Sequence, residues 1–163
     1  MFLRTREELR TVKRLLTQAE DEARAMGDDL PGPEHLVLAA LALPDRTAVE
    51  ALIAVGVDED ALRVALSTAQ EHALLSVGAQ PFELPEADLA PGTGPYRSTP
   101  QAQRTFRTAA ALAKAERPHR LRGAHVVAAA ADESEHGTWA RALWLLRVPP
   151  ADLRAAALEA VRH

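Results

Sequence analysis

The side chains with the best spacing for chemistry are histidines and the acids near them. Glu133 and His136 stand three residues apart, the helical spacing of the glutamate–histidine pairs in carboxylate-bridged iron sites. Such a site needs two of these pairs and two further glutamates, and the sequence has one pair, so no metal is expected. The chain also lacks cysteine and a serine nucleophile elbow, which argues against nucleophilic catalysis.

Two other histidines share a common context. His35 and His125 each stand at the start of an apolar run, where an imidazole can bond to backbone groups of the preceding loop. Nothing near them completes a catalytic arrangement, so we interpret both as structural histidines. No glycine is followed by lysine, which excludes the GxxxxGK[ST] phosphate loop. We therefore expect no ATPase activity, no peptidase activity and no cofactor.

These two histidines mark an internal repeat. The stretch PGPEHLVLAALA, from Pro31 to Ala42, is echoed ninety residues later (125 minus 35) by LRGAHVVAAAA. The flanking apolar residues correspond at an offset of 90 before the histidines and 91 after them. The matches are Val12, Leu16, Ala19 and Ala23 with Ala102, Phe106, Ala109 and Ala113, then Ala51, Leu52, Val57 and Leu62 with Ala142, Leu143, Val148 and Leu153. We interpret the chain as two copies of one helical unit.

Composition favours an all-α protein. Hydrophobic residues make up 47% of the chain and aromatic residues only 4%, whereas sheets favour β-branched and aromatic side chains. At 163 residues the chain is long enough to bury a core, and we expect one domain over residues 1–163. The sequence shows neither a signal peptide nor an apolar stretch of about 18 residues, so a cytoplasmic location is expected. The net charge of −4, with mixed signs, predicts no nucleic-acid partner.

Capping residues and helix breakers predict four helices in each unit. The expected helices cover residues 6–26, 33–43, 47–55 and 58–75 in repeat one (5–76), then 99–116, 123–131, 137–146 and 150–163 in repeat two (99–163). Thr5 and Glu8 predict a capping box at the first helix, and Leu9 is expected on its buried stripe.

Residues 77–98 are expected to link the two repeats. They hold four prolines and three glycines, too many for a regular element. The apolar residues Phe82, Leu84, Leu89 and Tyr96 leave two alternatives open, a segment that packs back on the helices and a loose tether.

The repeated motif resembles one known family. Pro31-Gly32-Pro33-Glu34-His35 before an apolar helix is similar to the I-G-T-E-H-I-L-L-G-L motif in the N-terminal domain of Clp unfoldases, closest to the ClpC type. The opening Met1-Phe2 and Thr99-Pro100 at the start of repeat two also resemble that family. The second copy of the motif has lost the glutamate, and the linker is longer than usual.

The resemblance implies an all-helical, pseudo-twofold domain that recognises substrates and adaptors. We expect a stand-alone module that binds proteins, peptides or peptide-like ligands, with a Clp unfoldase among its partners and no contact with membranes. The alternative is the substrate-receiving domain of a longer ATP-dependent unfoldase, although the chain ends just after the last expected helix. A helical scaffold without a ligand is a third interpretation.

ClpC-type domains recognise phosphorylated arginine, and the resemblance implies a pocket in each repeat made by the motif glutamate and a threonine near the start of the first helix. Carried over residue by residue, repeat one keeps Glu34 but has Leu9 in place of the threonine. Repeat two keeps Thr99 but has Ala124 in place of the glutamate. Each pocket would retain half of the pair, so weak or absent phosphoarginine binding is expected.

The remaining partner contacts are expected on the first helix and the linker. The residues that we assign to ligand or partner binding there are Phe2, Arg6 and Arg10. A solvated charged face is the alternative interpretation of the two arginines. Thr5 or Thr11 could replace the missing hydroxyl beside Glu34.

Overall fold

The computed structural model describes the backbone of residues 2–76 and 97–163, and the side chains of residues 6–75 and 97–163. Within these ranges the chain forms eight α-helices and no strand. They are α1 (Phe2–Ala25), α2 (Pro33–Leu41), α3 (Thr47–Ala54), α4 (Glu59–Ser76), α5 (Pro100–Ala115), α6 (Gly123–Asp132), α7 (Gly137–Leu145) and α8 (Pro150–Arg162). No helix in the described residues is long and apolar enough to cross a membrane.

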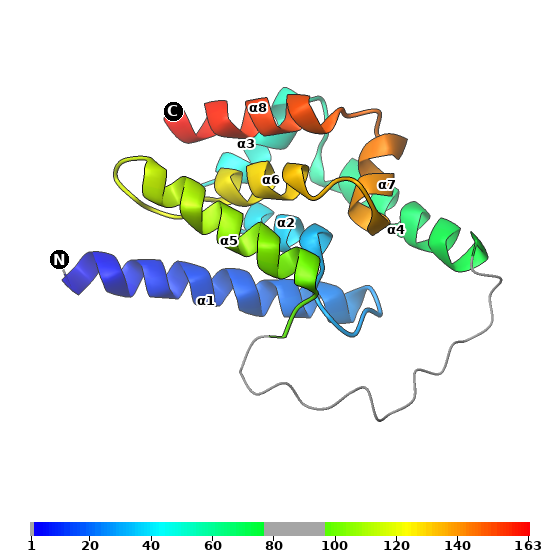
Figure 1. The fold of residues 1–163 in the computed structure, drawn as a ribbon, viewed down its shortest axis with the longest axis horizontal. Helices are drawn as coiled ribbons and strands as arrows, with labels where there is room; N and C mark the ends of the chain where they lie inside the picture. The colour runs from blue at the N-terminus through cyan, green and yellow to red at the C-terminus, as the bar shows by residue number, and fades with distance from the viewer. Residues whose placement is uncertain (1, 77–96) are drawn as a thin grey trace.

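Two short helices form the centre of the fold. Every residue of α2 is buried, and so is every residue of α6 from Gly123 to Ala131. These helices pack against each other, with α1 and α5 on one side and α3 and α8 on the other (Figure 1). Gly123 allows a close approach at this junction, because an added Cβ would lie 2.9 Å from the carbonyl oxygen of Ala40 in α2.

The two repeats interlock rather than stand side by side. Helix α3 packs on α8 and α4 on α7, so each outer pair joins a helix of repeat one to a helix of repeat two. The buried apolar residues of both repeats form one continuous hydrophobic core. Burial of each central helix therefore depends on the other repeat.

Polar contacts between the repeats follow the pseudo-twofold relation. The backbone N–H of Thr99, just before α5, donates to the carbonyl of Pro31, just before α2, at 3.0 Å. In the reciprocal place Glu7 of α1 pairs with Arg120 in the loop before α6, at 3.0 Å. The first helix of each repeat thus begins beside the loop that leads into the central helix of the other repeat.

The start of α1 corrects one prediction. The helix begins at Phe2, so Thr5 lies inside it and the capping box with Glu8 is wrong. The residues before Thr5 contain no helix breaker, so nothing stops the helix from extending to Phe2.

The buried stripe of α1 also differs from expectation. Leu9 is 64% exposed, and the buried apolar positions are Leu15, Ala19 and Ala23. At 24 residues α1 is much longer than the nine-residue α2 on which it packs, so its N-terminal half extends beyond that partner.

The C-terminal half of α1 is fastened to α4 by an ion pair. Glu22, nearly buried, accepts two hydrogen bonds from Arg63, at 2.8 and 2.9 Å. The Arg63 guanidinium holds the pKa of Glu22 below its ordinary value despite burial. The expected linker, residues 77–98, lies almost entirely outside the described residues, and so do Phe82, Leu84, Leu89 and Tyr96.

Replacing Gly123 by alanine is expected to lower the free energy of unfolding by about 1–3 kcal/mol, because the added methyl overpacks the junction of the repeats. A Cβ there would lie 2.8 Å from the Cβ of Ala48 and 2.9 Å from the carbonyl oxygen of Ala40. Urea unfolding measures the loss. Adding Ala48→Gly should restore part of it, whereas strictly additive effects would contradict this packing.

Candidate functional site

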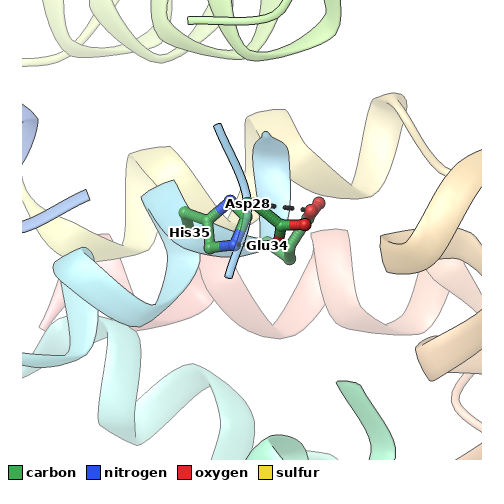
Figure 2. A group of neighbouring side chains, drawn as sticks. All are labelled: Asp28, Glu34 and His35. Carbon is green, nitrogen blue, oxygen red and sulfur yellow. Dashed lines mark ion pairs between the residues drawn. The ribbon is translucent and has the colours of Figure 1, made fainter. Parts of the chain in front are cut away.

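His35 lies at the start of α2, where it closes the loop that follows α1. Its side chain is 1% exposed, and its Nδ1 accepts a hydrogen bond from the backbone N–H of Gly32 at 2.8 Å. That bond places the ring proton on Nε2, which lies 3.0 Å from Oδ2 of Asp28 but outside hydrogen-bonding alignment. Figure 2 shows His35 together with Asp28 and Glu34.

His125 repeats this arrangement at the start of α6. Its Nδ1 accepts from the backbone N–H of Arg122 at 3.0 Å, and its Nε2 lies 3.5 Å from Oε2 of Glu116. Burial lowers the pKa of His125, and the nearby Glu116 carboxylate opposes that shift. Both histidines therefore hold a loop against the start of a central helix, which is the geometry of a structural residue.

Asp28, Glu34 and His35 bring three possible metal ligands within 4.8 Å of one another. However, Nδ1 of His35 already accepts from Gly32, and the Asp28 carboxylate accepts from the side-chain amide of Gln70 at 2.9 Å. These donors are committed to contacts that tie α1, α2 and α4 together. These contacts favour a structural role for the cluster, and the expectation that no metal binds there stays a prediction.

Glu34 is the acid of the motif, and its carboxylate folds over Gly32. A Cβ at Gly32 would lie 2.8 Å from either carboxylate oxygen, so glycine leaves room for this side chain. Burial raises the pKa of Glu34, against the opposing effect of His35. Its position at the start of α2 suits a carboxylate, because the helix dipole is positive there.

The start of α6 is filled in a different way. Its first backbone N–H groups donate to side chains of repeat one: Gly123 to Asp45 at 3.2 Å and Ala124 to Thr47 at 2.9 Å. An acid from the α2–α3 turn therefore occupies the position that an anionic ligand would take at this helix start. In the sequence, Asp45 and Thr47 look like residues of an ordinary turn between two helices, so their contacts with α6 could not be predicted.

The structure also corrects the pairing of the pocket residues. Thr99 and Ala124 lie at opposite ends of the α5–α6 hairpin, about 25 Å apart along the helix axis. The same holds for Leu9 and Glu34 in the α1–α2 hairpin. Thr99 instead bonds to Pro31, near Glu34, because the first helix of each repeat begins beside the central helix of the other. The two retained residues thus belong to one end of the molecule.

A groove runs between α1 and α5, which lie side by side in Figure 1. It has a volume of ≈ 190 Å³ and an apolar floor made of side chains from both repeats, with charged residues at its edge. The floor comprises Leu16, Ala19, Leu36, Ala102 and Phe106; the charges are Glu20, Arg97 and Arg107. Leu16 and Phe106 are equivalent positions in the two repeats. Their apolar spacing predicts that both face other helices, but it does not predict the groove that they line.

Comparison with known proteins identifies the family. A family model described as the Clp repeat (R) N-terminal domain matches residues 10–92, just over half of the chain. The chain belongs to the Clp N-terminal domain family. Domains of this family are substrate- and adaptor-binding modules of Clp chaperones and carry no catalytic activity of their own.

A solved structure supports the same fold over both repeats. The N-terminal domain of the caseinolytic protease associated chaperone ClpD from Arabidopsis thaliana is similar over 94% of this chain and 93% of that chain, with a TM-score of 0.60. At 17% identity this likeness shows the fold alone. The expected all-α fold of two four-helix Clp repeats is confirmed. No curated protein matches the sequence.

The remaining assigned residues of this Clp domain lie on α1. Arg10 lines a shallow groove of ≈ 560 Å³ together with Lys13 and Arg14. Arg6 is exposed outside that groove, and the side chain of Phe2 lies outside the described residues. The four basic residues Arg6, Arg10, Lys13 and Arg14 make no ion pair within the described part of the chain. Their role in partner binding stays a prediction.

The stability of the domain is expected to fall as the pH drops through about 6.5. Because burial lowers the pKa of His125, the folded state binds fewer protons than the unfolded chain below that pH. His125 therefore contributes its full stability above about pH 6.5 and loses it as the pH falls toward its folded pKa. His125→Asn, which keeps an acceptor near Nδ1, should weaken this dependence.

Urea unfolding of both proteins between pH 5 and pH 8 measures the effect. The exposed His72 offers a matched control, and His72→Asn should leave the pH slope unchanged. Equal slopes for the parent chain and His125→Asn would show that His125 is not the group responsible.

Proposed function

We propose that this Clp N-terminal domain is a recognition module that captures exposed apolar side chains of proteins and peptides in the α1–α5 groove. One observation carries the proposal: the groove has an apolar floor at a junction of the two repeats, lined by Leu16 and Phe106. Both side chains are partly buried and leave part of their apolar surface open. A short apolar segment of an unfolded protein matches this surface.

The edge of the groove suits a peptide backbone. The side-chain amide of Gln103 lies there, with its N–H donating to the carbonyl of Ser98 at 3.3 Å, and Glu20 and Arg107 supply one charge of each sign. Mixed charges around an apolar floor fix the orientation of a ligand without restricting it to one net charge. The basic residues Arg6 and Arg10 would extend the contact surface along α1.

The module would act as an adaptor, or as a decoy that competes with a Clp unfoldase for substrates. The resemblance to substrate-receiving domains supports a role beside an unfoldase. If the domain is instead the N-terminal part of a longer unfoldase, it would bind substrates in the same groove. The casein experiment below therefore tests both alternatives.

The parent chain is expected to bind fluorescein-labelled casein, an unfolded protein, with an affinity measurable by anisotropy. Phe106→Ser should weaken that binding on the order of tenfold, because it removes a large apolar side chain from the groove floor. Leu74→Ser, at an apolar residue that is 66% exposed on α4, is the matched control and should bind casein as the parent does. No casein binding by the parent, or equal loss in both variants, would contradict the proposal.

Free phosphoarginine is expected to bind weakly and at no more than one site per chain. Thr99 and the Glu34 loop lie at one end of the molecule, but the Thr99 hydroxyl already accepts the N–H of Ala102 at 3.1 Å. The equivalent position at the start of α6 is occupied by Asp45 and Thr47. Titration calorimetry measures the stoichiometry, and Glu34→Gln should abolish any binding. Two equivalent tight sites would show that these pockets are intact.

A further inference from the structure

A second groove is lined by α7, by the loops before and after it, and by His72 of α4. Helices α7 and α4 pack against each other on the side of the molecule away from the start of α1 (Figure 1). The volume of the groove is ≈ 970 Å³, at the upper end of the range for ligand-binding clefts. It shares no lining residue with the α1–α5 groove. We call it the Trp144 groove, after the largest side chain that lines it.

Trp144 is unusually exposed for its type. The other tryptophan of α7, Trp139, is 1% exposed and donates its indole N–H to the carbonyl of Ala130 at 2.8 Å. Trp144 is 76% exposed, and its indole N–H makes no hydrogen bond within the described residues, whereas its backbone carbonyl accepts from the N–H of Arg147 at 3.1 Å. Core packing accounts for Trp139 but not for Trp144. Exposed tryptophan beside arginine is the composition that dominates binding hot spots.

Arg147, which also lines the groove, has a strained backbone. Its φ is +57°, in the left-handed region that favours glycine. The equivalent residue of repeat one, 91 positions earlier, is Gly56, with a φ of +80°. Repeat one therefore shows that glycine meets the demands of the fold at this turn. Arg46 has a similar φ of +60° outside the groove, so the strain at Arg147 supports a function only together with its place in the Trp144 groove.

The charge of the groove indicates the kind of partner. Arg141 lies one helical turn before Trp144, and Arg147 lies just after the helix. Neither arginine makes an ion pair within the described residues. Glu135 is the only acid among the lining residues. Two unpaired guanidinium groups beside an exposed aromatic ring favour carboxylates that flank an apolar side chain.

We infer that the Trp144 groove binds an extended, acidic peptide segment of a partner protein. An apolar side chain of the segment covers Trp144, and its carboxylates pair with Arg141 and Arg147. The groove thus gives the recognition module a second face, and its loss would leave binding in the α1–α5 groove unaffected.

A fluorescein-labelled acidic hexapeptide, DELFDE, tests the inference against its neutral twin, NQLFNQ, by anisotropy with the full chain. The acidic peptide is expected to bind at least tenfold more tightly than the neutral one. Trp144→Ala and Arg147→Gly should each weaken binding of DELFDE on the order of tenfold. Because Arg147→Gly also relieves the strained backbone, its melting temperature should equal or exceed that of the parent.

Matched controls come from repeat one. Ile53, at the position equivalent to Trp144, is 61% exposed, and Ile53→Ala should leave binding unchanged. Arg46 also has a positive φ of +60°, so Arg46→Gly removes the same charge and the same kind of strain away from the groove. Equal affinity for the two peptides, unchanged binding in Trp144→Ala and Arg147→Gly, or equal loss in Arg46→Gly would overturn the inference. So would heparin displacing the peptide equally well from parent and Trp144→Ala, because that result indicates a general attraction for anions.

Discussion

Every residue of α2 is buried, and the two helices that cover it most extensively are α1 of its own repeat and α6 of the other repeat. The approach of α2 and α6 is close enough that Gly123 has no room for a methyl group. The same junction satisfies the first N–H groups of α6 with Asp45 and Thr47. The outer helices then pack around this central pair and create both grooves, so the position of either groove depends on the α2–α6 contact.

The sequence predicts the helices well because the two repeats share the same helix breakers and the same apolar spacing. The equal contexts of His35 and His125 indicate two copies, and the apolar runs that follow them agree with the complete burial of α2 and of residues 123–131 of α6. Contacts between the repeats could not be predicted in this way, because an offset of 90 or 91 relates equivalent positions and not neighbouring ones. The family resemblance paired the phosphoarginine pocket residues within each repeat, where the helix hairpin separates them by about 25 Å.

The candidate binding surfaces were harder to predict than the fold. Leu16 and Phe106 follow the pattern of core residues, and only the packing of α1 beside α5 shows that a groove lies between them. Trp144 likewise continues the apolar pattern of α7, although it is exposed in the structure. Leu9 failed as a core prediction because periodicity identifies one face of a helix, but the length of the partner helix decides how much of that face is covered.

The mutual burial of α2 and α6 has a consequence for the newly synthesised chain. The two central helices are translated about 90 residues apart, which corresponds to roughly 5–20 s at cellular rates of synthesis. Throughout that interval α2 can pack on α1 but lacks α6, so part of its apolar surface stays uncovered. The contacts that complete the core are distant in sequence and slow to form. A domain for which we propose recognition of exposed apolar segments therefore exposes an apolar helix of its own during translation.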